Sequence, residues 1–283
     1  MTSASASGGL DLVVVGGLTV DRFTDGSSAP GGAVLHIARA LAGRDLRVGI
    51  VTTVGPEPEA AAGLSELRDL VASVEASAST ASITFGHAET AAGRELLLER
   101  RGGQVPPLPS HPSRAILFAP VADEIPAANL AVGGGAVRGA VLQGWLRSVG
   151  EGEPVTSRPI TATEPALLEA LGALDLVIGS SEDLRADGPG ALSQLEVLRA
   201  TLGDRPPLVV TDGAHGAWLD DGSGPRRLPL RDGVEGVSTI GAGDMFAAFM
   251  LLALAGSASA DPAVAALTAM DEVAAVLRSR QGD

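Results

Sequence analysis

A glycine-rich turn followed by an aspartate offers the clearest chemistry in this sequence. Gly241-Ala242-Gly243-Asp244 leads into an apolar stretch that predicts a helix running to about Leu254. The N–H groups in the first turn of a helix can bind an anion, and glycine lets a ligand approach the backbone closely. A carboxylate beside such a nest can take the proton from an attacking hydroxyl while the N–H groups hold a transferring phosphoryl group. Because the helix dipole alone also favours an aspartate there, the turn by itself leaves both interpretations open.

Buried strands alternating with helices are predicted to hold this turn in place. Residues 12–16 and 46–54 are apolar and rich in β-branched side chains, and a helix is predicted between them at 33–42. Strand, crossover helix and parallel strand together form a βαβ unit. The same patterns predict strands at 115–119, 139–142, 174–178 and 208–211, and helices at 164–171 and 191–202. The predicted fold class is therefore α/β, in three layers, with helices on both faces of a mostly parallel sheet.

Two stretches depart from this alternation. Residues 80–87 and 94–101 are predicted to be a pair of strands joined by a turn around Ala92-Gly93. They fit a small antiparallel flap outside the main sheet, from which the proline-rich stretch 103–112 returns to the core. Without an internal repeat or a long linker, we predict one domain over residues 1–283, with a small β lid contributed by about 17–30 and 80–102.

Composition excludes several partners and chemistries. The net charge of −14 repels nucleic acid backbones and anionic membrane surfaces, so neither is expected as a partner. All 20 basic residues are Arg, so an anionic substrate must find positive potential in Arg, a metal or backbone N–H groups. The absence of cysteine excludes disulfides and thiolate catalysis. The start of the chain lacks a signal-peptide pattern and the longest apolar run, 245–254, is too short for a bilayer, so a cytoplasmic location is expected.

Four motifs, in this order, resemble those of the ribokinase-like, or PfkB, family of carbohydrate kinases. They are Gly16-Gly-Leu-Thr-Val-Asp21, Pro30-Gly-Gly-Ala-Val-Leu-His36, Thr211-Asp-Gly-Ala-His-Gly216 and Ser238-Thr-Ile-Gly-Ala-Gly-Asp244. The last matches the family signature Asp-Thr-x-Gly-Ala-Gly-Asp at five of its six specified positions. The resemblance covers residues 11–278, and Ala119-Pro-Val-Ala-Asp-Glu124 and Gln143-Gly-Trp-Leu-Arg147 are similar to a branch with inositol-kinase-like members.

This resemblance implies transfer of the γ-phosphoryl group of ATP to a hydroxyl of a small sugar, polyol or nucleoside. Asp244 is implied to be the catalytic base, with an anion hole formed by Gly241, Ala242 and Gly243. The implied contacts to the acceptor come from Asp21, Gly31, Gly32 and His36. Those around the nucleotide come from Ser180, Thr211, Gly213 and Gly216, and Asp183 is implied to hold the water shell of Mg²⁺. The lid is implied to close over substrate, and a homodimer through its edges is left open.

Two departures from the family pattern matter for function. Ser238 replaces an aspartate that belongs to a monovalent-cation site in relatives, and its lack of charge argues against activation by such a cation. His36 replaces an asparagine on the substrate side, so the identity of the acceptor does not transfer. Arg94, on the lid, is a candidate for contacting a substrate phosphate or carboxylate, or else a solvated side chain. The other histidines, at 87, 111 and 215, lack metal-site spacing and are expected to be structural or solvated.

Two alternatives to a kinase remain. A catalytically impaired protein with this fold, acting in binding or regulation, is suggested by Ser238 and His36. A dinucleotide-dependent oxidoreductase is suggested by Gly16-Gly17 after a strand, but the Gly-x-Gly-x-x-Gly spacing is missing.

Overall fold

A mostly parallel sheet forms the centre of the computed structural model, which describes residues 9–90, 93–108, 112–133, 135–148, 150–230, 238–257 and 260–280, with only the backbone of 89, 90, 93 and 94. Within these ranges the sheet has nine strands, in the spatial order β16 (Arg226–Leu228), β15 (Ala217–Asp220), β14 (Leu208–Thr211), β13 (Leu176–Ser180), β9 (Val137–Val141), β8 (Ser113–Phe118), β1 (Leu10–Val15), β4 (Val48–Val54) and β5 (Ser73–Ala78). Neighbours from β14 to β5 run parallel, and β15 and β16 add an antiparallel edge.

Strand β1 shows why these apolar runs become central strands. Its side chains point alternately to the two faces of the sheet, and both faces are buried. Leu12 and Val14 join one hydrophobic core, while Val13 and Val15 join a second core on the other face. An uninterrupted apolar run therefore supplies side chains to the hydrophobic cores on both sides of the sheet, as expected for parallel strands covered by helices.

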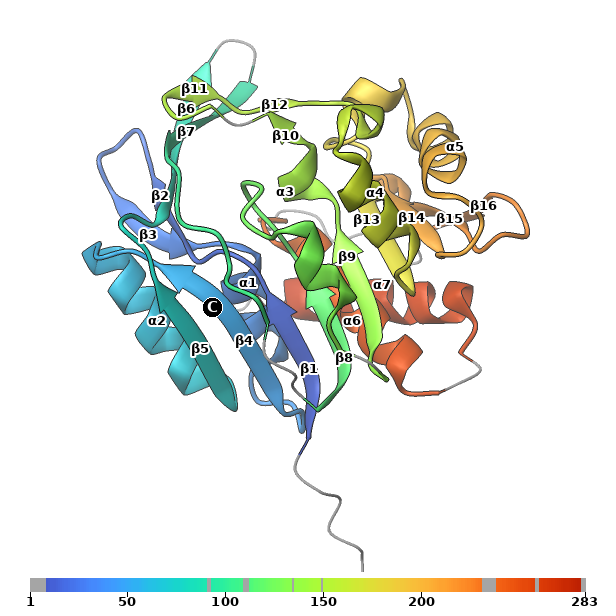
Figure 1. The fold of residues 1–283 in the computed structure, drawn as a ribbon, viewed down its shortest axis with the longest axis horizontal. Coiled ribbons are helices and arrows are strands. Elements are labelled where there is room, and N and C mark those ends of the chain that lie inside the picture. Colours follow the sequence, from blue (N-terminus) through green and yellow to red (C-terminus); the bar gives the residue numbers. More distant parts are fainter. Residues whose placement is uncertain are drawn as a thin grey trace, which may run out of the picture.

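Helices cover both faces, which confirms the predicted three-layer α/β class (Figure 1). The first core contains buried side chains of α1 (Ala33–Leu41), α2 (Pro58–Leu70), α6 (Ala242–Ala255) and α7 (Pro262–Ser279). The second contains those of α3 (Gln143–Leu146), α4 (Pro165–Gly172) and α5 (Ala191–Leu202). Short 3₁₀ turns at Ala127–Ala131, Ile160–Ala162, Arg185–Asp187 and Gly213–His215 complete the helical elements among the described residues.

A second sheet stands beyond the ends toward which β1 and β8 run (Figure 1). Its order is β11 (Glu153–Pro154), β7 (Gly93–Arg100), β6 (Ile83–Thr90), β2 (Thr19–Arg22) and β3 (Ser28–Gly31). The predicted antiparallel pair outside the main sheet is confirmed by β6 and β7, and β2 joins this pair by running parallel to β6. A further two-stranded ladder joins β10 (Arg147–Ser148) to β12 (Thr156–Ser157).

Helix α2 and strand β5 were not predicted, for a common physical reason. Both lie at the margin of the fold and bury little. Only Ala60, Gly63 and Leu67 of α2 are buried, and β5 is the edge strand of the main sheet, with alternating exposed positions. An element that buries few side chains needs only a weak apolar periodicity. Such a weak pattern is difficult to recognise in a sequence.

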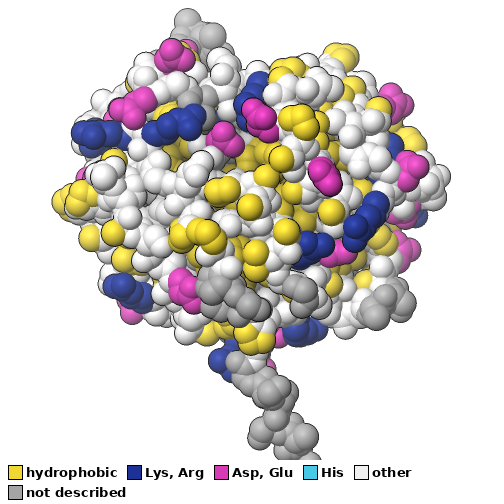
Figure 2. All heavy atoms as spheres, in the orientation of Figure 1, with side chains coloured by type: hydrophobic (Ala, Val, Ile, Leu, Met, Phe, Trp, Pro, Cys, Tyr) yellow, Lys and Arg dark blue, Asp and Glu magenta, His cyan; other side chains and the backbone are white. Residues whose placement is uncertain are grey.

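On the face shown in Figure 2, acidic and basic side chains are interspersed among hydrophobic ones. Among the described residues, no helix combines the length and the apolar character needed to cross a membrane.

Candidate active site

Three carboxylates that were predicted to be site residues, and that are far apart in the sequence, affect the pKa of one guanidinium in the structure. Asp183, Asp244 and Asp21 each raise the pKa of Arg147, with Asp183 and Asp244 contributing most. They come from the residues after β13, the start of α6 and strand β2. The edge of a parallel sheet formed by the carboxyl ends of its strands is the usual place for a ligand site in α/β proteins.

The start of α6 has free backbone donors. Gly241 is the N-cap and adopts a left-handed conformation, with φ of 79°, and no side chain caps the helix. Its carbonyl accepts a hydrogen bond from the amide of Met245 at 2.9 Å. In the described part of the chain, the amides of Gly243 and Asp244 have no hydrogen-bond partner, and a Cβ added at Gly243 would meet no atom within 4 Å. Two N–H groups without a partner therefore lie at the positive end of the helix dipole, with open space beside Gly243, as an anion site requires.

Asp244 is poised to exchange a proton. Its side chain is partly buried, and burial raises the pKa of the carboxyl to about 7. The positive charge of Arg147 lowers this pKa, while the nearby carboxylate of Asp183 raises it further. A carboxylate whose pKa lies near neutral pH can accept a proton readily and release it again.

Replacing Gly241 by Ala should destabilise the fold at this turn. The left-handed backbone disfavours a Cβ, and an added Cβ would lie 2.7 Å from Cγ of His36. We expect a loss of about 1–2 kcal/mol in the free energy of unfolding, measured by urea denaturation at pH 7. Gly243→Ala is the matched control for stability, because its Cβ meets open space and alanine favours a helix. An equal loss in both variants would contradict the strain assigned to Gly241.

Asp21 lies against the Gly31-Gly32 turn. Strand β2 pairs with β3 so that Thr19 faces Gly31, and a Cβ at Gly31 would stand 2.1 Å from Oδ2 of Asp21. Only glycine therefore lets this carboxylate lie beside the backbone. Nε2 of His87, on β6, lies 3.2 Å from Oδ1 of Asp21, and the His87 ring stacks on Phe23 at 5.0 Å between centroids. The histidine expected to be structural or solvated thus contacts a predicted substrate residue.

The residues predicted around the nucleotide lie on two adjacent strands. Ser180 ends β13 and pairs with Thr211, which ends β14. Ser180 Oγ donates to Oδ2 of Asp183 at 2.5 Å, and the amide of Asp183 donates back to Ser180 Oγ at 3.1 Å. The turn that contains Gly213 and Gly216 follows directly and leads into β15. One carboxylate, two hydroxyl side chains and a tight turn are therefore side by side at this edge.

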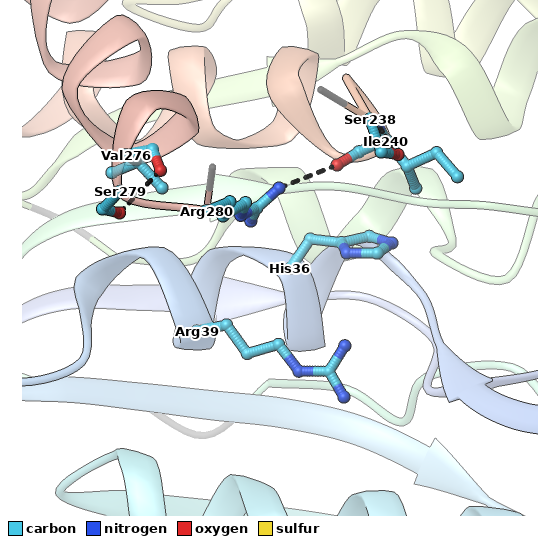
Figure 3. Close-up of a pocket in the computed structure, with 7 residues that line it drawn as sticks. All are labelled: His36, Arg39, Ser238, Ile240, Val276, Ser279 and Arg280. Atoms are coloured by element: carbon cyan, nitrogen blue, oxygen red, sulfur yellow. Dashed lines mark hydrogen bonds between the residues drawn. The ribbon is translucent and has the colours of Figure 1, made fainter. Parts of the chain in front are cut away.

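A hollow of about 370 Å³ lies beside the start of α6 (Figure 3). Its lining residues are His36, Arg39, Ser238, Ile240, Val276, Ser279 and Arg280. The Arg280 guanidinium points to the Ile240 carbonyl and lies 3.5 Å from it (Figure 3). Burial lowers the pKa of His36, and the charges of Arg39 and Arg280 lower it further against the opposing charge of Asp21. His36 is therefore placed as a neutral ring beneath Gly241, and its predicted contact with the acceptor stays a prediction.

Glu124 is a residue of the site region that sequence patterns did not single out as functional. Its side chain is buried and accepts four hydrogen bonds from three backbone amides, those of Gly17, Val121 and Ala122, at 2.7–3.0 Å. Burial raises the pKa of this carboxyl, and the hydrogen bonds oppose the rise. Glu124 therefore ties the end of β1 to the loop after β8, beside the predicted site.

Arg147 is the second such residue. Its Nη1 donates to the Val121 carbonyl at 2.9 Å, and its guanidinium carbon lies 5.5 Å from the centroid of the Phe85 ring on β6. Burial lowers the pKa of Arg147, and the surrounding carboxylates oppose this. The only sequence signal was its place at the end of Gln143-Gly-Trp-Leu-Arg147, where Trp145 is a fully buried packing anchor.

Some predictions fall outside what the structure describes. The side chain of Arg94 and the whole of His111 lie outside the described residues. Within the described ranges, no three His, Asp or Glu side chains gather into a metal-binding cluster.

Residues 128–282 match the model of the protein family described as "pfkB family carbohydrate kinase". No curated protein matches the chain in sequence.

Solved structures with the same fold cover nearly the whole chain. A pyrophosphate-dependent kinase in the ribokinase family, complexed with a pyrophosphate analog and myo-inositol, has a TM-score of 0.70 and 19% identity, covering 94% of this chain and 95% of that chain. Arabidopsis thaliana ribokinase complexed with ribose and ATP has a TM-score of 0.71 and 16% identity, covering 95% and 93%. Aminoimidazole riboside kinase from Salmonella enterica has a TM-score of 0.68 and 20% identity, covering 94% and 93%. At these identities the likeness shows a shared fold.

Proposed function

We propose, since the chain belongs to the pfkB family of carbohydrate kinases, that it transfers the γ-phosphoryl group of ATP to a hydroxyl of a small sugar, polyol or nucleoside. The observation that carries this proposal is the start of α6, where free amides stand beside a carboxylate of raised pKa. The amides suit the charge of a phosphoryl group, and the carboxylate suits the proton of a hydroxyl.

In the proposed reaction, Asp244 accepts the proton of the acceptor hydroxyl as its oxygen attacks the γ-phosphorus. A new P–O bond forms to the acceptor, the bond to the bridging oxygen breaks, and ADP leaves with the electron pair. The amides of Gly243 and Asp244 donate to the phosphoryl oxygens during transfer, and Asp21 accepts hydrogen bonds from other hydroxyls of the acceptor. The proton passes from Asp244 to solvent afterwards.

The residues present fit ATP and Mg²⁺ as partners. Open space at Gly243 and the turn after β14 leave room for the donor phosphates. Mg²⁺ is commonly held by one or two carboxylates with water and substrate phosphates, so Asp183 suffices as the residue that holds its water shell. When bound, Mg²⁺ neutralises charge on the donor phosphates. Nothing at Ser238 adds the charge that a monovalent-cation site would use, so we propose no such activation.

The second sheet supports a lid role for residues 17–30 and 80–102. Its strands β2 and β6 bring Asp21, His87 and Phe85 over the same region as Arg147. We propose that this sheet covers the acceptor and excludes water during transfer. Its edge strands β3 and β11 are the proposed place for a homodimer contact.

Turnover is the direct test of this function. The purified protein, with Mg²⁺ and either ATP or pyrophosphate, is incubated with a panel of sugars, polyols and nucleosides, and ADP or phosphate release is measured. Pyrophosphate is included because one kinase of the same fold uses it. Release with at least one acceptor and loss of that release in Asp244→Asn would support the proposal. Folded protein that is inactive across the panel, yet is stabilised by ATP, would favour the catalytically impaired binding protein instead.

The pH dependence of the reaction should report Asp244. Because its pKa is raised to about 7, the carboxylate is protonated and inactive as a base below that pH. We expect kcat/KM for the acceptor, at saturating donor, to rise with pH, to reach half its maximum near pH 7 and to level off above it. A profile already flat below pH 6 would contradict a base with this pKa.

A further inference from the structure

Arg147 carries a half-buried positive charge, and the described residues leave most of its N–H donors without an acceptor. A guanidinium has five N–H donors, yet among the described residues the only acceptor for Arg147 is the Val121 carbonyl, and no carboxylate lies within 4.0 Å in an ion pair. Withdrawing a charge even partly from water without a direct partner is costly. The structure therefore retains at this point a group whose remaining donors suit an anion from outside the chain.

The position of this guanidinium is fixed by the segment that carries it. The indole N–H of Trp145 donates to the Ile125 carbonyl at 3.0 Å, and Trp145 is fully buried. A Cβ at Gly144 would stand 2.3 Å from the Pro120 backbone, so α3 packs directly on the loop after β8. Arg147 itself pairs with Ser157 in the β10–β12 ladder. Its charge is thus held in place before any ligand binds, as a group acting in a transition state must be.

The surroundings of Arg147 indicate which anion it takes. Asp183 and Asp244 are the charges that affect it most, followed by Glu124 and Asp21. Its charge therefore acts on both the carboxylate on the donor side and the proposed base, and less on Asp21 on the acceptor side. The acceptor hydroxyl is neutral, whereas the transferring phosphoryl group carries negative charge on three oxygens. The chain contains no Lys that could serve there instead.

We propose that Arg147 is a catalytic residue that binds the transferring phosphoryl group together with the amides of Gly243 and Asp244. This inference rests on the proposed phosphoryl transfer. Arg147 keeps its proton throughout and contributes only N–H donors and charge, so the bonds made and broken are those of the transfer itself. Its charge also keeps Asp244 more acidic than burial alone would leave it.

Kinetics of Arg147→Met and Arg147→Lys test this role. Loss of one such donor group typically lowers kcat by about 10²–10³-fold, which we expect for Arg147→Met, with a smaller loss for Arg147→Lys because the charge remains. Guanidinium ion added to the buffer should restore part of the activity of Arg147→Met. Without the charge, the acid limb of the kcat/KM profile should move to higher pH in Arg147→Met and stay in place in Arg147→Lys. Arg114→Met is the matched control, since Arg114 pairs with Asp11 at the opposite end of β8 and should leave all these quantities unchanged.

Anion binding provides a readout that does not depend on turnover. Calorimetry with inorganic pyrophosphate should show binding by the parent and by Arg114→Met, and an affinity at least about tenfold lower for Arg147→Met. If Arg147→Met does not fold, Arg147→Lys decides the question by its kcat and its profile.

The two proposals fail in different ways. A parent that turns over, with Arg147→Met folded and its kcat within about threefold of the parent, would overturn the inference and leave the kinase intact. A rise in the acceptor KM alone would also overturn it, because Arg147 would then bind the acceptor. Pyrophosphate binding that is absent from the parent, or unaffected in Arg147→Met, would overturn it as well. If pyrophosphate binding depends on Arg147 but no acceptor is phosphorylated, the anion site stands and the proposed transfer falls.

Discussion

Asp244→Asn should lower kcat by about 10³-fold, because the amide cannot accept the proton of the acceptor hydroxyl. Asn has the same size as Asp, so the amides at the start of α6 stay in place and the acceptor still binds. A group that acts only in the transition state lowers kcat and kcat/KM equally. Steady-state kinetics on the acceptor found in the panel measure both constants. Asp69→Asn, the same change at an exposed position of α2, is the control and should match the parent.

The same variant has a stability signature that separates loss of chemistry from loss of fold. The pKa of Asp244 is raised from 3.8 to about 7 in the folded protein, so between these pH values the folded state holds a proton that the unfolded state has released. The free energy of unfolding of the parent therefore falls as pH rises from about 4 to about 7. Asn lacks this cost. We expect Asp244→Asn to unfold at higher urea concentration than the parent at pH 8, and at nearly the same concentration at pH 4. An inactive variant that is less stable at pH 8 would contradict the assigned burial of the carboxylate, and a kcat within about tenfold of the parent would remove Asp244 as the base.

Much of the frame could be predicted from the sequence because it depends on local patterns. Helix α5 and strand β14 lie at the predicted bounds, Ala191–Leu202 and Leu208–Thr211. An amphipathic helix and a buried apolar strand can each be recognised from the pattern of a few neighbouring residues. Gly241 was predicted at a helix start, and it is the N-cap of α6. Strand pairing was harder, because no local pattern says that residues 19–22 join 83–86 in parallel.

The residues that sequence patterns left out act through long-range contacts. Glu124 is an ordinary acidic residue in a loop until the fold brings the amide of Gly17, 107 positions away, to its carboxylate. Arg147 likewise gains its significance only where Asp183 and Asp244 lie around it. Titratable groups in the core of a site are defined by what surrounds them, and that is a property of the folded chain.

Glu124→Gln should lower the free energy of unfolding by about 2 kcal/mol, although it only replaces one carboxylate oxygen by an NH₂ group. Both oxygens of the carboxylate accept hydrogen bonds, Oε1 from Gly17 and Val121 and Oε2 from Val121 and Ala122. An amide side chain has one acceptor oxygen, and its NH₂ group would face a backbone N–H. At least one buried amide would lose its partner, and such an unsatisfied group costs about 1–3 kcal/mol.

This loss should also reach the chemistry. Glu124 holds Val121 in place, and the Val121 carbonyl accepts from Nη1 of Arg147. Loosening the loop therefore displaces the guanidinium, and we expect kcat of Glu124→Gln to fall together with its stability. Urea denaturation at pH 7 and kinetics on the same preparation test both effects. Glu196→Gln, the same change on the exposed side of α5, should alter stability by no more than about 0.5 kcal/mol and leave kcat unchanged. If Glu124→Gln were as stable as the parent, the three amides would not depend on the charged carboxylate, and Glu124 would not be what ties the end of β1 to the loop after β8.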